Sequence, residues 1–106
     1  MRVLITGGAG FIGANVAIAL NAQHPDWDVV ALDNLSRRGS EMNLRRLREA
    51  EIEFAHGDVR TLDDLLAIGE IDAVIECSAE PSVLAGFGGS PSYVINTNLV
   101  GAYNCL

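Results

Sequence analysis

Short apolar runs alternate with amphipathic stretches along the whole chain. The runs are bounded by polar or glycine-containing turns. Residues 27–33 are nearly continuous in apolar residues at their end, which is typical of a strand in a parallel sheet covered on both faces, whereas residues 51–56 alternate. The predicted strands are residues 3–5, 27–33, 51–56 and 72–77. Between and after these strands, apolar residues recur at helical spacing. The predicted helices are residues 11–23, 41–50 and 61–69, and a fourth that begins at Ser90 and Pro91.

Apolar positions set the period of each predicted helix. From the first helix to the fourth they are Ile12, Val16, Ala19 and Leu20; Leu44 and Leu47; Leu62, Leu65 and Leu66; and Ile95, Leu99, Ala102 and Leu106. We expect the leucines of the second and third helices to face inward. Pro25 ends the first helix, and Thr61, followed by acids in the first turn, favours a helix start.

The order of elements is strand, helix, strand, helix, strand, helix, strand, helix. Such alternation predicts an α/β fold with a doubly wound parallel sheet and right-handed crossovers. We expect the strand order 3-2-1-4, which is the first portion of a two-halved sheet. The chain of 106 residues has room for one domain, without an internal repeat or linker. Because the last helical pattern still runs at Leu106, we expect residues 1–106 to be the N-terminal segment of a longer protein.

Composition and charge exclude several classes of protein. The net charge is −7, which argues against general nucleic-acid and membrane-surface binding, and all seven basic residues are arginine. No apolar run is long enough to cross a membrane, and because the N-terminus reads directly into a strand we expect no signal peptide. Cys77 and Cys105 are too few for a disulfide framework or a metal site. We therefore expect two free thiols in a reducing cytoplasm.

Three glycines follow the first predicted strand at fixed offsets, at Gly7, Gly10 and Gly13, and the first helix begins directly after them. In such a turn the first glycine permits a sharp bend, the second lets the backbone approach a phosphate, and the third allows close packing of helix on strand. The helix N-terminus then presents N–H groups and a positive dipole end to the anion. The pattern predicts a pyrophosphate site in a Rossmann-like fold.

Asp33 lies twenty residues after Gly13, at the end of the second predicted strand. A carboxylate at this place accepts hydrogen bonds from the adenosine ribose and repels a 2′-phosphate, which favours NAD over NADP. The alternative is an aspartate that caps a loop. The charges of Arg37 and Arg38 would neutralise a 2′-phosphate, so NADP stays an alternative cofactor. The arginines of the second helix, Arg45, Arg46 and Arg48, are either a solvated face or a phosphate contact.

Two further strand ends meet the same edge of the predicted sheet. Asp58 and Val59 end the third strand, where a carboxylate and a backbone N–H suit the edge of adenine; an ordinary strand-ending turn is the alternative. Residues 77–80 follow the fourth strand, beside the first. Ligands of open α/β sheets bind outside the carboxyl ends of the strands, so all these positions converge.

Four motifs carry a family resemblance: Thr6-Gly7-Gly8-Ala9-Gly10-Phe11-Ile12-Gly13, Asp33-Asn34-Leu35-Ser36, Gly57-Asp58-Val59-Arg60 and Asn96-Thr97-Asn98-Leu99-Val100-Gly101-Ala102. In register, they resemble the extended short-chain dehydrogenase/reductases. Within that superfamily the chain is similar to the NAD-dependent sugar-nucleotide epimerases and dehydratases, especially the CDP-paratose 2-epimerase-like members. The resemblance covers all 106 residues.

The resemblance implies NAD as the cofactor and assigns its contacts. The pyrophosphate would be held by the glycine turn with Phe11 and Ile12, the adenosine ribose by Asp33, Asn34 and Ser36, and adenine by Asp58 and Val59. The nicotinamide side would be lined by Cys77, Ser78, Ala79 and Thr97. Glu80, Ser82, Val83 and Asn98 would lie on the sugar side. Many relatives have a histidine where this chain has Glu76.

The resemblance also implies a catalytic tyrosine whose pKa is lowered by a lysine four residues later. The chain has Tyr93 and Tyr103 but no lysine, so neither tyrosine fits that role. We expect the family's catalytic Tyr, Lys and Ser/Thr to lie beyond Leu106, and no catalytic residue within the chain. The 106 residues alone are then expected to bind NAD weakly and to turn over no substrate.

For the parent protein, the resemblance implies a nucleotide-sugar epimerase that transiently oxidises and re-reduces a sugar carbon. The alternatives are a nucleotide-sugar 4,6-dehydratase, a non-catalytic NAD(H)-sensing protein and, less consistent with Gly13, an S-adenosylmethionine methyltransferase. The substrate would be a nucleotide sugar, without nucleic-acid or membrane partners. The last helix has the apolar stripe of a homodimer helix in this family, although packing on its own sheet explains the stripe equally well.

Overall fold

The computed structural model describes residues 1–36 and 39–78 of the chain. Eight elements follow one another in the order that the sequence predicts, with one added turn of 3-10 helix before the second α-helix. They are β1 (Arg2–Thr6), α1 (Phe11–Gln23), β2 (Asp28–Asp33), η1 (Ser40–Met42), α2 (Asn43–Glu49), β3 (Glu53–His56), α3 (Leu62–Leu66) and β4 (Ala73–Glu76). The helix predicted from Ser90 lies outside the described residues.

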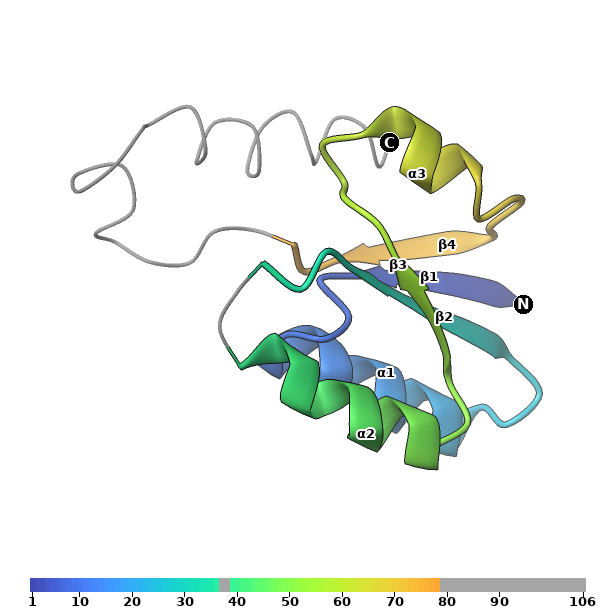
Figure 1. Ribbon diagram of the computed structural model, residues 1–106. Helices are drawn as coiled ribbons and strands as arrows, with labels where there is room; N and C mark the ends of the chain where they lie inside the picture. The colour runs from blue at the N-terminus through green and yellow to red at the C-terminus, as the bar shows by residue number, and fades with distance from the viewer. Residues whose placement is uncertain (37–38, 79–106) are drawn as a thin grey trace.

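The four strands form one parallel sheet in the order β3-β2-β1-β4, which confirms the predicted order. β1 lies in the middle, with Val3 beside Val29 of β2 on one side and beside Ala73 of β4 on the other. α1 and α2 cover one face of the sheet, and α3 lies over the opposite face (Figure 1). The fold is therefore α/β and doubly wound, as the alternation of elements predicts.

Alternating side chains of β1 and β2 divide the core between the two faces. Val3 and Ile5 of β1 point to the face covered by α1 and α2, whereas Leu4 points to the α3 face. In α2, Leu47 is fully buried against the first of these clusters, as its spacing predicts. The apolar residues of β1 and β2 thus pack on one layer of helices or the other, which explains the continuous apolar runs of these two strands, whereas Val74 and Ile75 of β4 are exposed.

The fully buried residues of α1 are small ones and not its large apolar residues. Gly13, Ala14 and Ala17 are buried, whereas Ile12 is 64% exposed and Ala19 is exposed. The large residues Val16 and Leu20 are partly buried and pack against the same core cluster, at the sides of the fully buried small residues. The helix has the bounds that periodicity predicts, but its most buried residues are the small ones.

The inward face predicted for α3 from its apolar spacing is partly wrong. The helix is short, and two of its three predicted inward leucines are exposed, Leu62 at 50% and Leu66 at 66%. Leu65 packs on the core, together with Ile68 just after the helix. Thr61 occupies the N-cap position as predicted, although its side chain makes no capping hydrogen bond. A helix of so few residues turns only a narrow face to the sheet, and Leu65 with Ile68, three residues apart, provides it.

Arg2 connects the elements at the amino edge of the sheet. Its backbone N–H donates to Asp72 at 2.7 Å, and its guanidinium bonds to the carboxylates of Asp28 at 3.0 Å and Glu53 at 3.2 Å. The guanidinium also donates to the carbonyl of Ile68 at 2.6 Å. One side chain therefore joins β1, β2, β3 and the segment before β4.

No helix among the described residues is long and apolar enough to span a bilayer, since the longest, α1, has 13 residues.

Candidate cofactor site

The carboxyl ends of all four strands point to one edge of the sheet, opposite the N-terminus (Figure 1). The glycine turn follows β1 at this edge, the segment 34–36 follows β2, the segment 57–61 follows β3, and residues 77–78 follow β4. The structure therefore brings together the segments that hold most of the predicted site. Parallel α/β sheets bind their ligands at this edge.

Backbone contacts leave no room for a side chain at Gly7 or Gly13 of the glycine turn. Gly7 has a left-handed φ of 64°, and a Cβ there would lie 2.5 Å from the carbonyl oxygen of Cys77. A Cβ on Gly13 would lie 2.1 Å from the carbonyl oxygen of Gly7. Gly8 N–H donates to the Leu32 carbonyl at 2.9 Å, which ties the turn to the end of β2. The turn thus has one available path between β1 and α1.

The N-terminus of α1 is suited to an anion. Gly10 is its N-cap, no side chain caps it, and its first turn contains no acidic residue. The first N–H groups of a helix have no intrahelical acceptor, and the dipole gives this end a partial positive charge. The side chain of Phe11 is 83% exposed, so it does not cover the helix end from within the fold. Such backbone donors are suited to a phosphate group.

Asp33 receives two backbone N–H groups and keeps acceptor capacity. Its Oδ2 accepts from Ala9 N–H at 3.0 Å, and its Oδ1 accepts from Leu35 N–H at 2.8 Å. A carboxylate offers about four lone-pair sites, so each oxygen can still accept one more hydrogen bond. Leu35 has a φ of 60°, an uncommon value for a residue with a Cβ, and the bond from its N–H to Asp33 stabilises it. The half-buried carboxylate therefore both shapes the loop and remains able to accept a ribose hydroxyl.

Asn34 and Asp58 join the loops after β2 and β3. Asn34 Nδ2 donates to Asp58 Oδ2 at 3.1 Å, and Asn34 Oδ1 accepts from Ser36 N–H at 3.0 Å. Arg60 Nε donates to the two Asp58 oxygens at 2.9 and 3.0 Å. Side-chain hydrogen bonds from Arg60 hold the pKa of Asp58 at about 2, below its ordinary 3.8, although burial opposes this shift. Asp58 is therefore ionised throughout the neutral range.

The Asn34–Asp58–Arg60 cluster was not predicted from the sequence. Asp58 receives hydrogen bonds from the amide of Asn34 and from both the backbone and side chain of Arg60, so its acceptor sites are largely used within the chain. The side chain of Val59 packs in the core on the α3 face, so a contact of Val59 with a base would involve its backbone. The Asp-x-Arg spacing of residues 58–60 is the sequence signal for the ion pair. The adenine contact of Asp58 and Val59 stays a prediction.

The segment after β4 is bound to β1 through Thr6. Cys77 N–H donates to the Thr6 carbonyl at 3.1 Å and to Thr6 Oγ1 at 3.2 Å. Glu76 Oε1 accepts from Thr6 Oγ1 at 3.3 Å, from Ser78 N–H at 2.7 Å and from Ser78 Oγ. Burial, and next the charge of Glu76, raise the pKa of the Cys77 thiol. Cys77 therefore lies at the site as a neutral thiol, and Glu76, the departure from the family pattern, orders the turn into Ser78.

Several predicted site residues lie outside the described part of the chain. They are Ala79, Glu80, Ser82, Val83, Thr97 and Asn98, together with Arg37, Arg38, Tyr93 and Tyr103. Within residues 1–36 and 39–78, no group of three or more side chains is arranged to hold a metal ion.

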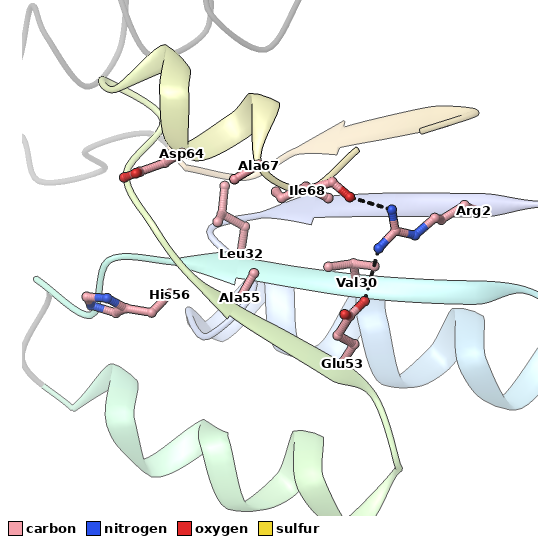
Figure 2. Close-up of a pocket in the computed structure, with 9 residues that line it drawn as sticks. All are labelled: Arg2, Val30, Leu32, Glu53, Ala55, His56, Asp64, Ala67 and Ile68. Atoms are coloured by element: carbon pink, nitrogen blue, oxygen red, sulfur yellow. Dashed lines mark hydrogen bonds and ion pairs between the residues drawn. The ribbon is translucent and has the colours of Figure 1, made fainter. Parts of the chain in front are cut away.

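A hollow of about 210 Å³ lies between α3 and strands β2 and β3, away from the glycine turn (Figure 2). Its floor is apolar, with Val30 and Leu32 among its lining residues. Its polar groups already have partners, since Arg2 bonds to Glu53 and to the Ile68 carbonyl, as Figure 2 shows. The hollow offers no set of converging, unpaired polar groups and is distinct from the strand-end site.

Comparison with known proteins places the chain in a family. The model of the NAD dependent epimerase/dehydratase family matches residues 3–106. The chain belongs to this family. The resemblance predicted from the four motifs is thereby confirmed, and so is NAD as the family's cofactor. The geometry agrees, because a glycine turn, an open helix N-terminus and a carboxylate at the end of β2 suit a dinucleotide.

Members of the epimerase/dehydratase family match most or all of the chain. The dTDP-glucose 4,6-dehydratase of Mycobacterium tuberculosis (strain ATCC 25618 / H37Rv) is 36% identical over 108 residues, covering 100% of this chain and 32% of that protein. The CDP-paratose 2-epimerase of Salmonella typhi is 44% identical over 66 residues, covering 61% of this chain and 19% of that protein. The structure of the Thermus thermophilus UDP-glucose 4-epimerase in complex with NAD has a TM-score of 0.78 and 33% identity, covering 98% of this chain and 32% of that one. The chain thus spans about a third of the length of the full-chain relatives that it matches.

Proposed function

We propose that this chain is the NAD-binding segment of a nucleotide-sugar epimerase, which transiently oxidises and re-reduces one sugar carbon. The observation that carries the proposal is the conformation of the glycine turn, which leads to the uncapped N-terminus of α1. Hydrogen bonds to Leu32 and Asp33 and the close approach of the Cys77 carbonyl fix this conformation. Membership of the NAD-dependent family supports it.

In this proposal each strand end has one task. The first-turn N–H groups of α1, at Phe11 to Gly13, bind the pyrophosphate. Asp33 accepts hydrogen bonds from the adenosine ribose through the acceptor sites that Ala9 and Leu35 leave open. Its negative charge disfavours a 2′-phosphate, so NAD is preferred over NADP. Asn34 and Ser36 at the ribose, Asp58 and Val59 at adenine, and Cys77 and Ser78 at the nicotinamide ribose complete the proposed contacts.

NAD supplies reversible hydride acceptance to this chemistry. Oxidation of the sugar carbon also releases the proton of its hydroxyl; return of the hydride to the opposite face of the carbon, and of a proton to the oxygen, gives the epimer. The chain contains no lysine to lower the pKa of a tyrosine base, so we propose that the 106 residues bind cofactor without turning over a sugar.

A 4,6-dehydratase is the second candidate. The M. tuberculosis dTDP-glucose 4,6-dehydratase matches all of this chain, whereas the S. typhi CDP-paratose 2-epimerase matches 61% of it. Both activities begin with oxidation of a sugar carbon by NAD, so the described site suits either. For the whole protein we also propose a cytoplasmic location. We further propose a homodimer formed through the helix predicted from Ser90, and sedimentation equilibrium of the whole protein would test it.

Calorimetric titration of the chain with NAD and NADP tests the cofactor site. We expect NAD to bind more tightly than NADP, and Asp33→Asn to weaken NAD binding about tenfold or more, since hydrogen bonds to a charged acceptor are lost. Asp26→Asn, the same change at an exposed position away from the site, is the matched control and leaves the affinity unaltered. Absence of NAD binding, or equal effects of the two substitutions, would contradict the proposal.

A further inference from the structure

The peptide groups on both sides of Ala9 are held by side chains from other elements. Ala9 is fully buried in the glycine turn. Its N–H donates to Asp33 Oδ2 at 3.0 Å, and its carbonyl accepts from Asn43 Nδ2 at 2.7 Å. The first contact belongs to the proposed ribose-binding carboxylate. The second comes from the first residue of α2, to which neither the motifs nor the proposed function gives a role.

The orientation of the Asn43 amide is fixed by a chain of hydrogen bonds. Arg46 Nη1 donates to Asn43 Oδ1 at 3.2 Å, and Arg46 Nη2 donates to Asn15 Oδ1 at 2.8 Å. Asn15 Nδ2 in turn donates to the Phe11 carbonyl at 2.7 Å. Because a guanidinium only donates, the amide oxygen of Asn43 faces Arg46 and its nitrogen faces Ala9. The chain of bonds runs from the glycine turn through α2 and returns to the first residue of α1.

The bond from Asn43 determines the direction of one particular peptide group. The Ala9 carbonyl and the Gly10 N–H belong to the same planar peptide unit, and Gly10 N–H donates to the Gly7 carbonyl at 3.0 Å. The closest backbone contacts of the turn are at Gly7 and Gly13, whereas Gly10 tolerates both signs of φ, so its own φ does not fix the direction of this unit. A rotated unit would turn the carbonyl away from Asn43 and the N–H away from Gly7. The bond from Asn43 therefore acts together with the Gly7 bond in keeping the entrance to α1 in one conformation.

We propose that Asn43 is a positioning residue for the pyrophosphate site. Its amide clamps the Ala9–Gly10 peptide, and Arg46 and Asn15 keep that amide in the donating orientation. The clamp presents the first-turn N–H groups of α1 to the anion in a fixed arrangement. The inference deepens the proposed function and rests on it for the identity of the anion, but the clamp itself is a property of the chain without ligand.

The chain contains a matched control for this clamp. Asn21 Nδ2 donates to the Ala50 carbonyl at 2.9 Å, so it too joins α1 to the end of α2 through an asparagine amide. Both asparagines are half-buried, but Asn21 lies near the C-terminal end of α1, away from the turn. Asn43→Leu and Asn21→Leu remove the same kind of bond without adding a charge that would repel a phosphate.

Two readouts separate positioning from general loss of structure. ADP contains the pyrophosphate and adenosine does not, so we expect Asn43→Leu to weaken ADP binding about tenfold in a heteronuclear NMR titration and to leave adenosine binding unaltered. In the chain without ligand, amide hydrogen exchange of Gly10 is expected to quicken about tenfold, whereas that of Gly8 is unchanged. Asn21→Leu should produce neither effect.

The possible outcomes distinguish this inference from the proposed function. Unchanged Gly10 exchange in Asn43→Leu would overturn the clamp whatever ligand the chain binds. An equal loss of ADP and adenosine affinity would overturn the positioning role, because it would indicate a general structural effect. If the unsubstituted chain binds neither NAD nor ADP while Gly10 exchange still quickens in Asn43→Leu, the proposed function fails and the clamp stands.

Discussion

The two edges of the sheet are held together in different ways. At the amino edge, one side chain, Arg2, bonds to the carboxylates of Asp28 and Glu53, which are both largely exposed. At the carboxyl edge, side chains make hydrogen bonds to backbone groups, and backbone atoms approach one another closely at glycines, which have no Cβ. The amino edge is therefore stabilised by contacts that other side chains can replace, whereas the carboxyl edge has a backbone path that few sequences can follow.

The largest effect should come from adding one methyl group at the carboxyl edge. In Gly13→Ala the new Cβ would lie 2.1 Å from the carbonyl oxygen of Gly7, so helix and turn must separate. We expect a loss of about 3 kcal/mol or more in the free energy of unfolding, measured by urea denaturation, because the overlap is with backbone. Gly10→Ala is the control, since among the described residues its Cβ would meet the Gly7 carbonyl oxygen alone, at 3.2 Å. Equal stabilities of Gly13→Ala and the parent chain would contradict the close approach.

The second effect belongs to the amino edge and should leave the cofactor site unaltered. Arg2→Met keeps the aliphatic stem but removes the bonds to Asp28, Glu53 and the Ile68 carbonyl. Exposed ion pairs contribute little, so most of the expected loss of about 2 kcal/mol comes from the charge-assisted bond to the carbonyl. Thermal unfolding measures the loss, and Arg48→Met, at an exposed position of α2, is the control. A fall in NAD affinity in Arg2→Met would show that the two edges are not independent.

A smaller, pH-dependent effect is expected from Asp58 at the carboxyl edge. Its pKa is lowered from 3.8 to about 2 in the folded chain, so its contribution is present above pH 4 and lost as the pH falls toward 2. With part of the side chain in contact with water, we expect about 1–2 kcal/mol. The measurement is the difference in unfolding free energy between the parent chain and Asp58→Asn from pH 7 to 2.5. Asp26→Asn, the same change at an exposed position, is the control. A larger difference in acid than at pH 7 would contradict the predicted sign.

The sequence predicts backbone features of this molecule better than its side-chain contacts. The strand order, the bounds of α1 and the glycine turn all depend on local periodicity and on glycine spacing, and the structure confirms them. The contact faces of α1 and α3 depend instead on how each helix packs on the sheet, which apolar spacing alone does not determine. Ile12 and Leu66 are exposed, although both lie on an apolar period.

The contacts that shape the candidate site link residues far apart in the chain. Asn43 lies 34 positions from Ala9, and Asp33 lies 24 positions from it. Asp33 was predicted because its distance from the glycines follows a known pattern, whereas nothing in the local sequence distinguishes Asn43 from any polar residue at a helix start. The pairing of Asp58 with Arg60 spans only two positions and was open to prediction from sequence.

The smallest effect concerns Cys77 at the carboxyl edge. Its backbone N–H bonds to Thr6, whereas none of the hydrogen bonds described for this edge involves its thiol. Burial, followed by the charge of Glu76, raises its pKa, so at pH 8 the thiolate is scarcer than in an unfolded peptide. In a Cys105→Ser background, we expect the rate at which iodoacetamide modifies Cys77 to be at least about threefold lower in the folded chain than after unfolding in urea. Glu76→Gln should speed the reaction of the folded chain only slightly, because burial is the larger cause. A folded-state rate above that of the unfolded chain would instead indicate an activated thiol, and the carboxyl edge would then contain a nucleophile as well as a binding surface.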